Sequence, residues 1–154
     1  MNGDRRTAIV VMTDGVDNAL PGIFGDGSST PFPQLLSIVR ESDVLVFPIY
    51  LDTEKEEVKR HRTPREAYVT AREELSQLAE TCGTTMYKAA KIEDLESVYG
   101  EVIKVLGTVY SIGYRPSNNN RDGKWRSVVV QVNAHDGLVA RSKRGYYAKQ
   151  LASQ

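Results

Sequence analysis

The chain has 154 residues, of which 40% are hydrophobic and 26% are charged, a globular balance rather than a disordered or fibrous one. Lysine plus arginine equals aspartate plus glutamate at 20 each, so no net field favours nucleic acid or an anionic membrane. No apolar run approaches the roughly 20 residues of a membrane span. The single cysteine, Cys82, excludes an internal disulfide and a cysteine-cluster metal site.

The first predicted element is a strand at residues 8–12, an unbroken apolar run that contains three consecutive β-branched residues. A short β-branched run of this kind is typical of a strand buried on both faces, as parallel sheets require. Asp14 follows just past the carboxyl end of the strand, where open α/β sheets place their ligands. The next segment, 16–33, is rich in glycine, proline and serine and is predicted to be a long loop.

Helices and strands then alternate along the chain. Their spacing predicts a helix over 34–41, a strand over 44–51, a helix that starts at 63–66 and ends before Gly83, a strand over 84–89 and a helix over 92–106. Pro48 lacks an N–H donor, which indicates a bulge or an edge strand at that point. Thr63 and Glu66 have the spacing of a capping box. Cys82 shares the apolar face of its helix and is predicted to be a core residue.

The pattern changes to a period of two after residue 108. Alternating apolar residues over 109–115, 125–132 and 138–148, separated by Asn, Asp and Gly turns, predict antiparallel hairpins. The predicted fold is therefore α/β, with three layers, a partly parallel sheet flanked by helices, and C-terminal antiparallel strands. We assign residues 1–108 to the α/β unit and 109–150 to a β extension of the same domain.

The segment RRTAIVVMTDGVDN at 5–18 and the tail segments YSIGYRP at 110–116, WRSVVV at 125–130 and RGYYA at 144–148 carry a family resemblance. The first resembles the fourth strand and following loop of a von Willebrand factor type A domain, and the tail resembles a bacterial branch of such domains that is common in soil acidobacteria. The resemblance covers nearly the whole chain and implies the C-terminal half to two-thirds of a Rossmann-like type A fold. It also implies parent proteins that are exported from the cytoplasm.

The resemblance implies a metal-ion-dependent adhesion site that holds magnesium. In the family, the ligands come from an Asp-x-Ser-x-Ser motif after the first strand, a threonine from a middle loop and the aspartate of Thr-Asp-Gly. Only the last carries over to this chain, as Asp14, so the site is expected to be incomplete and magnesium is expected in the full-length domain only. Residues 26–30 imitate the motif's spacing but follow no predicted strand. Asp17 and Asp52 are expected to be loop and strand-end residues.

The leading hypothesis is a non-enzymatic, adhesion-type module that binds an unidentified protein ligand. In the family, another strand pairs beside residues 8–12, so an exposed apolar edge is expected here, covered by a second copy, by a partner chain or by the C-terminal strands. A homodimer is the simplest of these.

Two alternatives stay open. One is a metal-assisted phosphohydrolase on a similar sheet, although no Ser-His or Cys-His pairing is suggested and neither His61 nor His135 sits at the end of a predicted strand. The other is a structural piece whose tail makes the contact, because aromatic residues concentrate there and aromatics are enriched at interfaces. Those aromatics could equally cover the sheet and the last helix.

Overall fold

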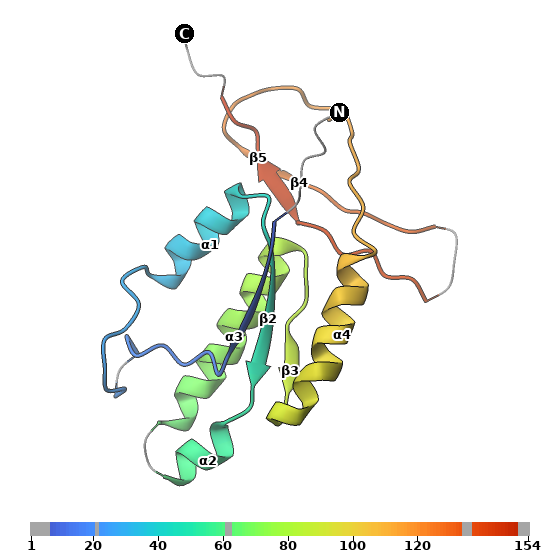
Figure 1. Cartoon of the computed structure of the whole chain (residues 1–154). Coiled ribbons are helices and arrows are strands. Elements are labelled where there is room, and N and C mark those ends of the chain that lie inside the picture. The colour runs from blue at the N-terminus through green and yellow to red at the C-terminus, as the bar shows by residue number, and fades with distance from the viewer. Residues whose placement is uncertain (1–6, 21, 61–62, 134–136, 151–154) are drawn as a thin grey trace.

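The computed structural model describes residues 7–20, 22–60, 63–133 and 137–150. Its elements in chain order are β1 (Ala8–Thr13), α1 (Phe32–Glu41), β2 (Leu45–Leu51), α2 (Glu54–Lys59), α3 (Arg65–Cys82), β3 (Tyr87–Ala89), the 3-10 turn Ile92–Asp94, α4 (Leu95–Leu106), β4 (Trp125–Ser127) and β5 (Gly145–Tyr147). The first three strands form one sheet and the last two form another (Figure 1). His61 and His135 lie outside the described residues. No helix in the described ranges is long and apolar enough to cross a membrane.

The main sheet is parallel throughout, in the order β1-β2-β3. The apolar runs therefore predicted the type of sheet correctly. The predicted burial of residues 8–12 on both faces is wrong, because β1 lies at the edge of the sheet and none of its residues is fully buried. The inference of a bulge or an edge at Pro48 is wrong, because β2 is the central strand and its register with β1 is unbroken. Asp52 N–H donates to Ala89 in β3, so the even residues of β2 direct their backbone groups toward β3. Pro48 precedes Ile49, the first residue paired with β3, and its missing N–H therefore interrupts no paired position.

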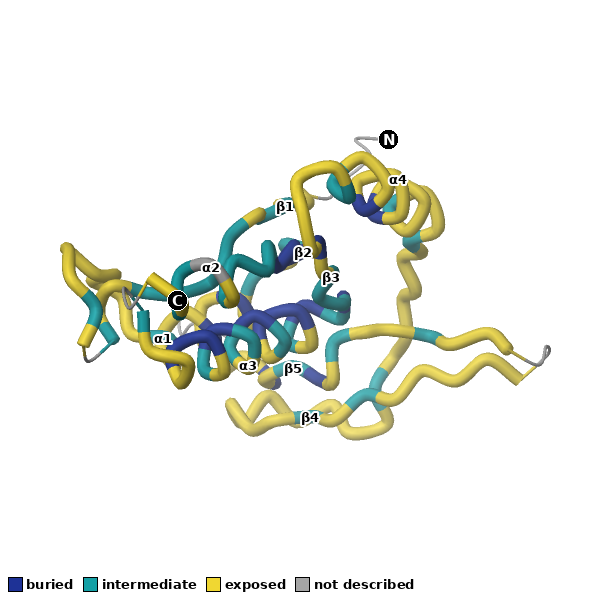
Figure 2. Tube along the Cα trace, turned by 90° about the horizontal axis from the view of Figure 1, so that it is seen from below, coloured by how far each residue is buried: buried dark blue, intermediate teal, exposed yellow. Residues whose placement is uncertain are grey.

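The two faces of the sheet are covered by different helices, which gives the three layers that the sequence predicted. On one face, Val46 packs with residues of α1 and α3, among them Leu36, Leu78 and Cys82. On the other face, Ile49 and Ala89 pack against Val98 of α4. Figure 2 shows burial concentrated along β2 and α3.

The ends of α3 depart from the prediction at one terminus only. Its N-cap is Pro64, whose ring carries no acceptor for the first N–H groups of the helix, so the predicted capping by Thr63 is wrong. Gly83 does end the helix in the left-handed conformation, with φ of 76°. Its missing Cβ also leaves room for the backbone of Ser142 and Lys143, which would lie under 3 Å from an added methyl group.

Helix α4 buries less of its apolar stripe than the sequence predicts. Val98 and Val102 are buried, whereas Ile92, Tyr99 and Ile103 of the predicted stripe are exposed. The reason is geometric: α4 packs at the β3 side of the sheet, and nothing among the described residues covers its outer side.

The C-terminal tail contains much less strand than its alternation predicts. Residues 109–115 form no strand, and the other two predicted strands shrink to the three-residue strands β4 and β5. Tyr110 is 82% exposed and Ile112 is 71% exposed. The alternating side chains therefore pack against no buried face, and strand pairing over this segment is not stabilised. The expectation that the tail aromatics cover the sheet fails at Tyr110 for the same reason.

The β4–β5 hairpin lies beyond the amino ends of the parallel strands, at the C-terminal ends of α1 and α3 (Figure 1). Lys143 donates to the Ser42 carbonyl at the end of α1, and Arg144 pairs with Glu80 of α3 at 2.7 Å. The hairpin is thus attached at the end of the molecule opposite to Asp14.

Candidate functional site

The Thr13-Asp14-Gly15 turn closes β1 at the carboxyl edge of the sheet, as predicted for Asp14. The Thr13 hydroxyl accepts from Gly15 N–H at 2.9 Å, and an Asp14 carboxylate oxygen accepts from Val16 N–H at 3.3 Å. Gly15 has φ of 74°, and an added Cβ would lie 2.7 Å from Leu75. Only glycine allows the chain to turn here while it touches α3.

Asp17 organises the loop that follows. One of its carboxylate oxygens accepts from Ala19 N–H and from Ser28 N–H, each at 2.9 Å, and this joins two parts of the loop that are 11 positions apart. The hydrogen bonds from Ala19 and Ser28 lower the pKa of Asp17 below its ordinary value. Asp17 is therefore a loop-closing residue, as the sequence indicated.

Glu74 on α3 adds a third carboxylate to this end of the molecule. Burial, and then the charge of Asp17, raise the pKa of Glu74 above its ordinary value. The side chain is half-buried, and neither a hydrogen bond nor an ion pair to it is found among the described residues.

The carboxyl end of β2 is occupied by paired charges. Asp52 contacts Lys88 of β3 at 2.8 Å, and the hydrogen bond from Lys88 lowers the pKa of Asp52. Glu54 pairs with Arg72 at 2.5 Å and with Arg65 at 3.1 Å. These carboxylates are neutralised by cationic side chains, which makes them structural groups and confirms Asp52 as a strand-end residue.

The residues described do not by themselves fit a magnesium ion. Magnesium requires near-octahedral oxygen ligands, and no group of three His, Cys, Asp or Glu residues that could hold a metal is found within the described ranges. The imitation motif at 26–30 is exposed, and its Ser28 hydroxyl donates to the Thr30 carbonyl instead of facing Asp14. Asp14 lies at the carboxyl edge of the sheet, and the described residues bring no companions to it that complete a metal site.

Several residues near the carboxyl edge of the sheet were not predicted from the sequence. Arg65 and Arg72 are seven positions apart on α3, so both lie on one helical face, and this spacing could have predicted their common partner Glu54. Thr53 had no such signal. Its hydroxyl is buried and has no partner among the described residues.

The outer edge of β1 is the second unusual feature. Leu45 N–H donates to the Thr7 carbonyl, so residues 7, 9, 11 and 13 direct their backbone groups toward β2. The backbone groups of Ala8, Val10 and Met12 therefore face away from the sheet, where β1 pairs with no other described strand. Ile9 is 45% exposed and Met12 is 48% exposed, so apolar side chains flank this open edge on both faces.

Comparison with known proteins adds no relative to this description: no protein-family model, curated protein or solved structure matches the chain. The likeness to type A domains therefore stands on the sequence segments quoted above, beside an α/β fold that many unrelated proteins share.

Proposed function

We propose that this chain is a non-enzymatic protein-interaction module of the von Willebrand type A kind, which assembles through the open edge of β1. The observation that carries the proposal is the edge itself: a six-residue apolar strand with one side of its backbone unpaired among the described residues. Folded proteins rarely leave such an edge free, because it pairs with any strand that reaches it.

The occupant that fits best is a second copy of the chain. Two β1 strands related by a two-fold axis would pair antiparallel, and each would supply the outward backbone groups of Ala8, Val10 and Met12. The half-exposed side chains of Ile9 and Met12 would be covered in the same step. Isologous dimers of this kind are the commonest oligomers, and no charged residue in β1 opposes the contact.

The two copies of the Thr13-Asp14-Gly15 turn would then lie on opposite edges of a continuous sheet, because the two β1 strands run in opposite directions. A catalytic role is not proposed. The thiol of Cys82 is buried in the core, where burial raises its pKa and disfavours the reactive thiolate. No observation favours the phosphohydrolase alternative over the interaction module.

The test is the oligomeric state of the whole chain, measured by light scattering over a range of concentrations. We expect a dimer for the unaltered protein. Met12→Lys should shift it to monomer, because a charge on the edge strand would have to be buried in the pair. The dissociation constant should rise at least about tenfold, since an unpaired buried charge costs well over 1.4 kcal/mol.

Ile103→Lys is the matched control, because Ile103 is also an exposed apolar residue (65%) but lies on α4, away from the edge. It should leave the dimer unchanged. A chain that is monomeric at every concentration, or a dimer that Met12→Lys does not weaken, would contradict the proposal.

A further inference from the structure

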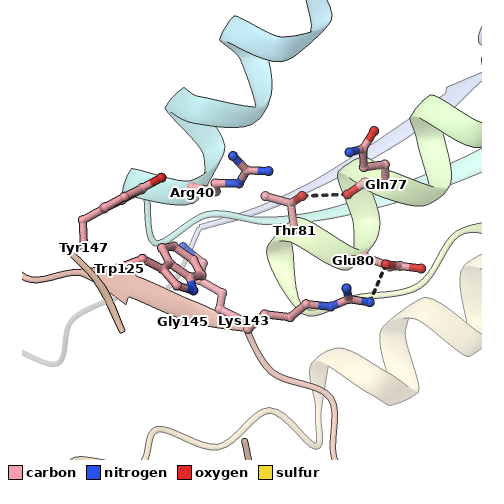
Figure 3. Close-up of a pocket in the computed structure, with 9 residues that line it drawn as sticks. Arg40, Gln77, Glu80, Thr81, Trp125, Lys143, Gly145 and Tyr147 are labelled. Atoms are coloured by element: carbon pink, nitrogen blue, oxygen red, sulfur yellow. Dashed lines mark hydrogen bonds and ion pairs between the residues drawn. The ribbon is translucent and has the colours of Figure 1, made fainter. Parts of the chain in front are cut away.

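A cavity of about 320 Å³ lies at the end of the molecule opposite to Asp14, between α1, α3 and the hairpin. Arg40 enters it from the last turn of α1, Gln77, Glu80 and Thr81 from α3, and Trp125 and Tyr147 from the hairpin (Figure 3). Its size falls in the range of small-ligand sites. A second hollow, also lined by Arg40 and Tyr147, continues along α1.

Cationic side chains outnumber carboxylates around the cavity. Arg40, Lys143 and Arg144 are cationic, and Glu80 is the one carboxylate that lines this cavity in the part of the chain described. Lys143 donates to the Ser42 carbonyl, and Arg144 pairs with Glu80. Arg40 has no ion pair or hydrogen bond to its side chain among the described residues, so its guanidinium is the group free to bind a ligand.

Arg40 is not needed to neutralise the helix ends beside it. A helix C-terminus attracts cations through its unpaired carbonyls, but here several of these carbonyls already have partners. At the end of α1, Ser42 N–H donates to Ile38 and Val39, and Lys143 donates to Ser42. At the end of α3, the backbone N–H groups of Gly83 and Thr84 donate to the Glu80 and Ala79 carbonyls.

The aromatic wall of the cavity is held in place by close packing. The rings of Trp125 and Tyr147 meet edge to face, with centroids 5.0 Å apart. The Trp125 ring also lies against Gly145, where an added Cβ would come within 2.6 Å of the indole. Both rings keep part of their surface exposed. A flat apolar body could stack here while an anionic group reaches Arg40.

We infer that this cavity binds a small ligand that carries an anionic group, carboxylate or phosphate, on a flat apolar ring. The guanidinium of Arg40 would hold the anion through two parallel N–H donors, the geometry in which arginine binds such groups best. Trp125 and Tyr147 would contact the ring.

The test uses benzoate, phenyl phosphate and neutral benzamide as probes of the full chain, followed by NMR. Because Trp125 is the only tryptophan, its indole N–H gives a single signal that reports on the cavity. Benzoate or phenyl phosphate should shift this signal in a saturable way, and benzamide should bind at least about fivefold more weakly. Whichever of benzoate and phenyl phosphate binds more tightly indicates whether the charged group of the ligand is a carboxylate or a phosphate. Equal binding of benzamide would overturn the inference.

Two variants test the role of charge. Arg40→Gln should weaken anion binding at least about tenfold, the factor expected for the loss of even one hydrogen bond between charged groups, whereas Arg60→Gln, just beyond the end of α2, should change nothing. Glu80→Gln should tighten binding about twofold, because it removes the carboxylate from the cavity, and a folding defect could not produce such a gain. Unchanged affinity in Arg40→Gln, or weaker binding in Glu80→Gln, would contradict the site.

The cavity is independent of the dimer edge. Met12→Lys should therefore bind benzoate as the unaltered chain does, and failure of either proposal would leave the other standing. Loss of binding in Met12→Lys would show that the anion site requires the dimer and would overturn this inference as stated.

Discussion

Gly15 joins two requirements at a single residue, a left-handed turn and contact with α3. Gly15→Ala should destabilise the fold by about 1–3 kcal/mol, because the new methyl group meets Leu75 and Ala71 in a backbone conformation that disfavours a side chain. Urea unfolding measures the change. Gly123→Ala is the matched control: its φ of 72° is similar, but nothing lies within 4 Å of the added Cβ. The two variants should differ, and equal losses would show that the approach to α3 costs nothing.

Asp17 should make the stability of the loop depend on acid. Because hydrogen bonds from Ala19 and Ser28 lower its folded-state pKa below 3.8, its contribution is present above the unfolded pKa and is lost as pH falls through the folded pKa. Thermal unfolding of Asp17→Asn and of the unaltered chain should therefore differ near neutral pH and converge below about pH 4. If the difference in unfolding temperature between the two proteins grew as the pH fell, the prediction would be contradicted.

At the scale of elements, Thr84 connects the end of α3 to the beginning of β2. Its buried hydroxyl lies within hydrogen-bond distance of the Val46 carbonyl and of the Ala79 carbonyl, at 2.5 and 3.1 Å. Thr84→Val keeps the shape and removes the donor, so it should cost about 1–3 kcal/mol. Thr81→Val is the control, because the Thr81 hydroxyl bonds to Gln77 at an exposed position and its loss should cost under about 0.5 kcal/mol. Equal effects in denaturant unfolding would show that burial does not decide the cost.

The helices and strands of the α/β unit were readable from sequence because each is set by local periodicity. The apolar spacing of Ala71, Leu75, Leu78 and Cys82 marks one helical face, and all four are buried. The tail was not readable in the same way. Alternation over 109–115 satisfies the strand pattern, but a strand also needs a partner and a covering layer, and neither is present among the described residues.

At the scale of the whole molecule, the carboxyl edge of the sheet divides into two parts. Around β2 the acidic side chains are paired with Lys88, Arg65 and Arg72, whereas Asp14, Asp17 and Glu74 have no cationic partner among the residues described. We expect calorimetric titration of the chain with magnesium and with manganese to show no saturable binding, because too few oxygen ligands converge on Asp14. Stoichiometric binding that Asp14→Ala abolishes would instead demonstrate a complete metal site.

The sequence by itself determined which segments of the α/β unit form the parallel strands and their main helices, where α3 ends, and that Asp14 follows an apolar strand. These features depend on residues within a few positions of one another, and their physics is already contained in spacing and backbone preference. Tertiary structure decided the rest. Pro48 is tolerated in a central strand only because pairing with β3 begins at the next residue. The cavity between α1, α3 and the hairpin exists because Lys143 reaches Ser42 across 101 positions and Gly83 lets the tail approach α3. Such contacts depend on packing between distant segments, which local sequence patterns do not encode.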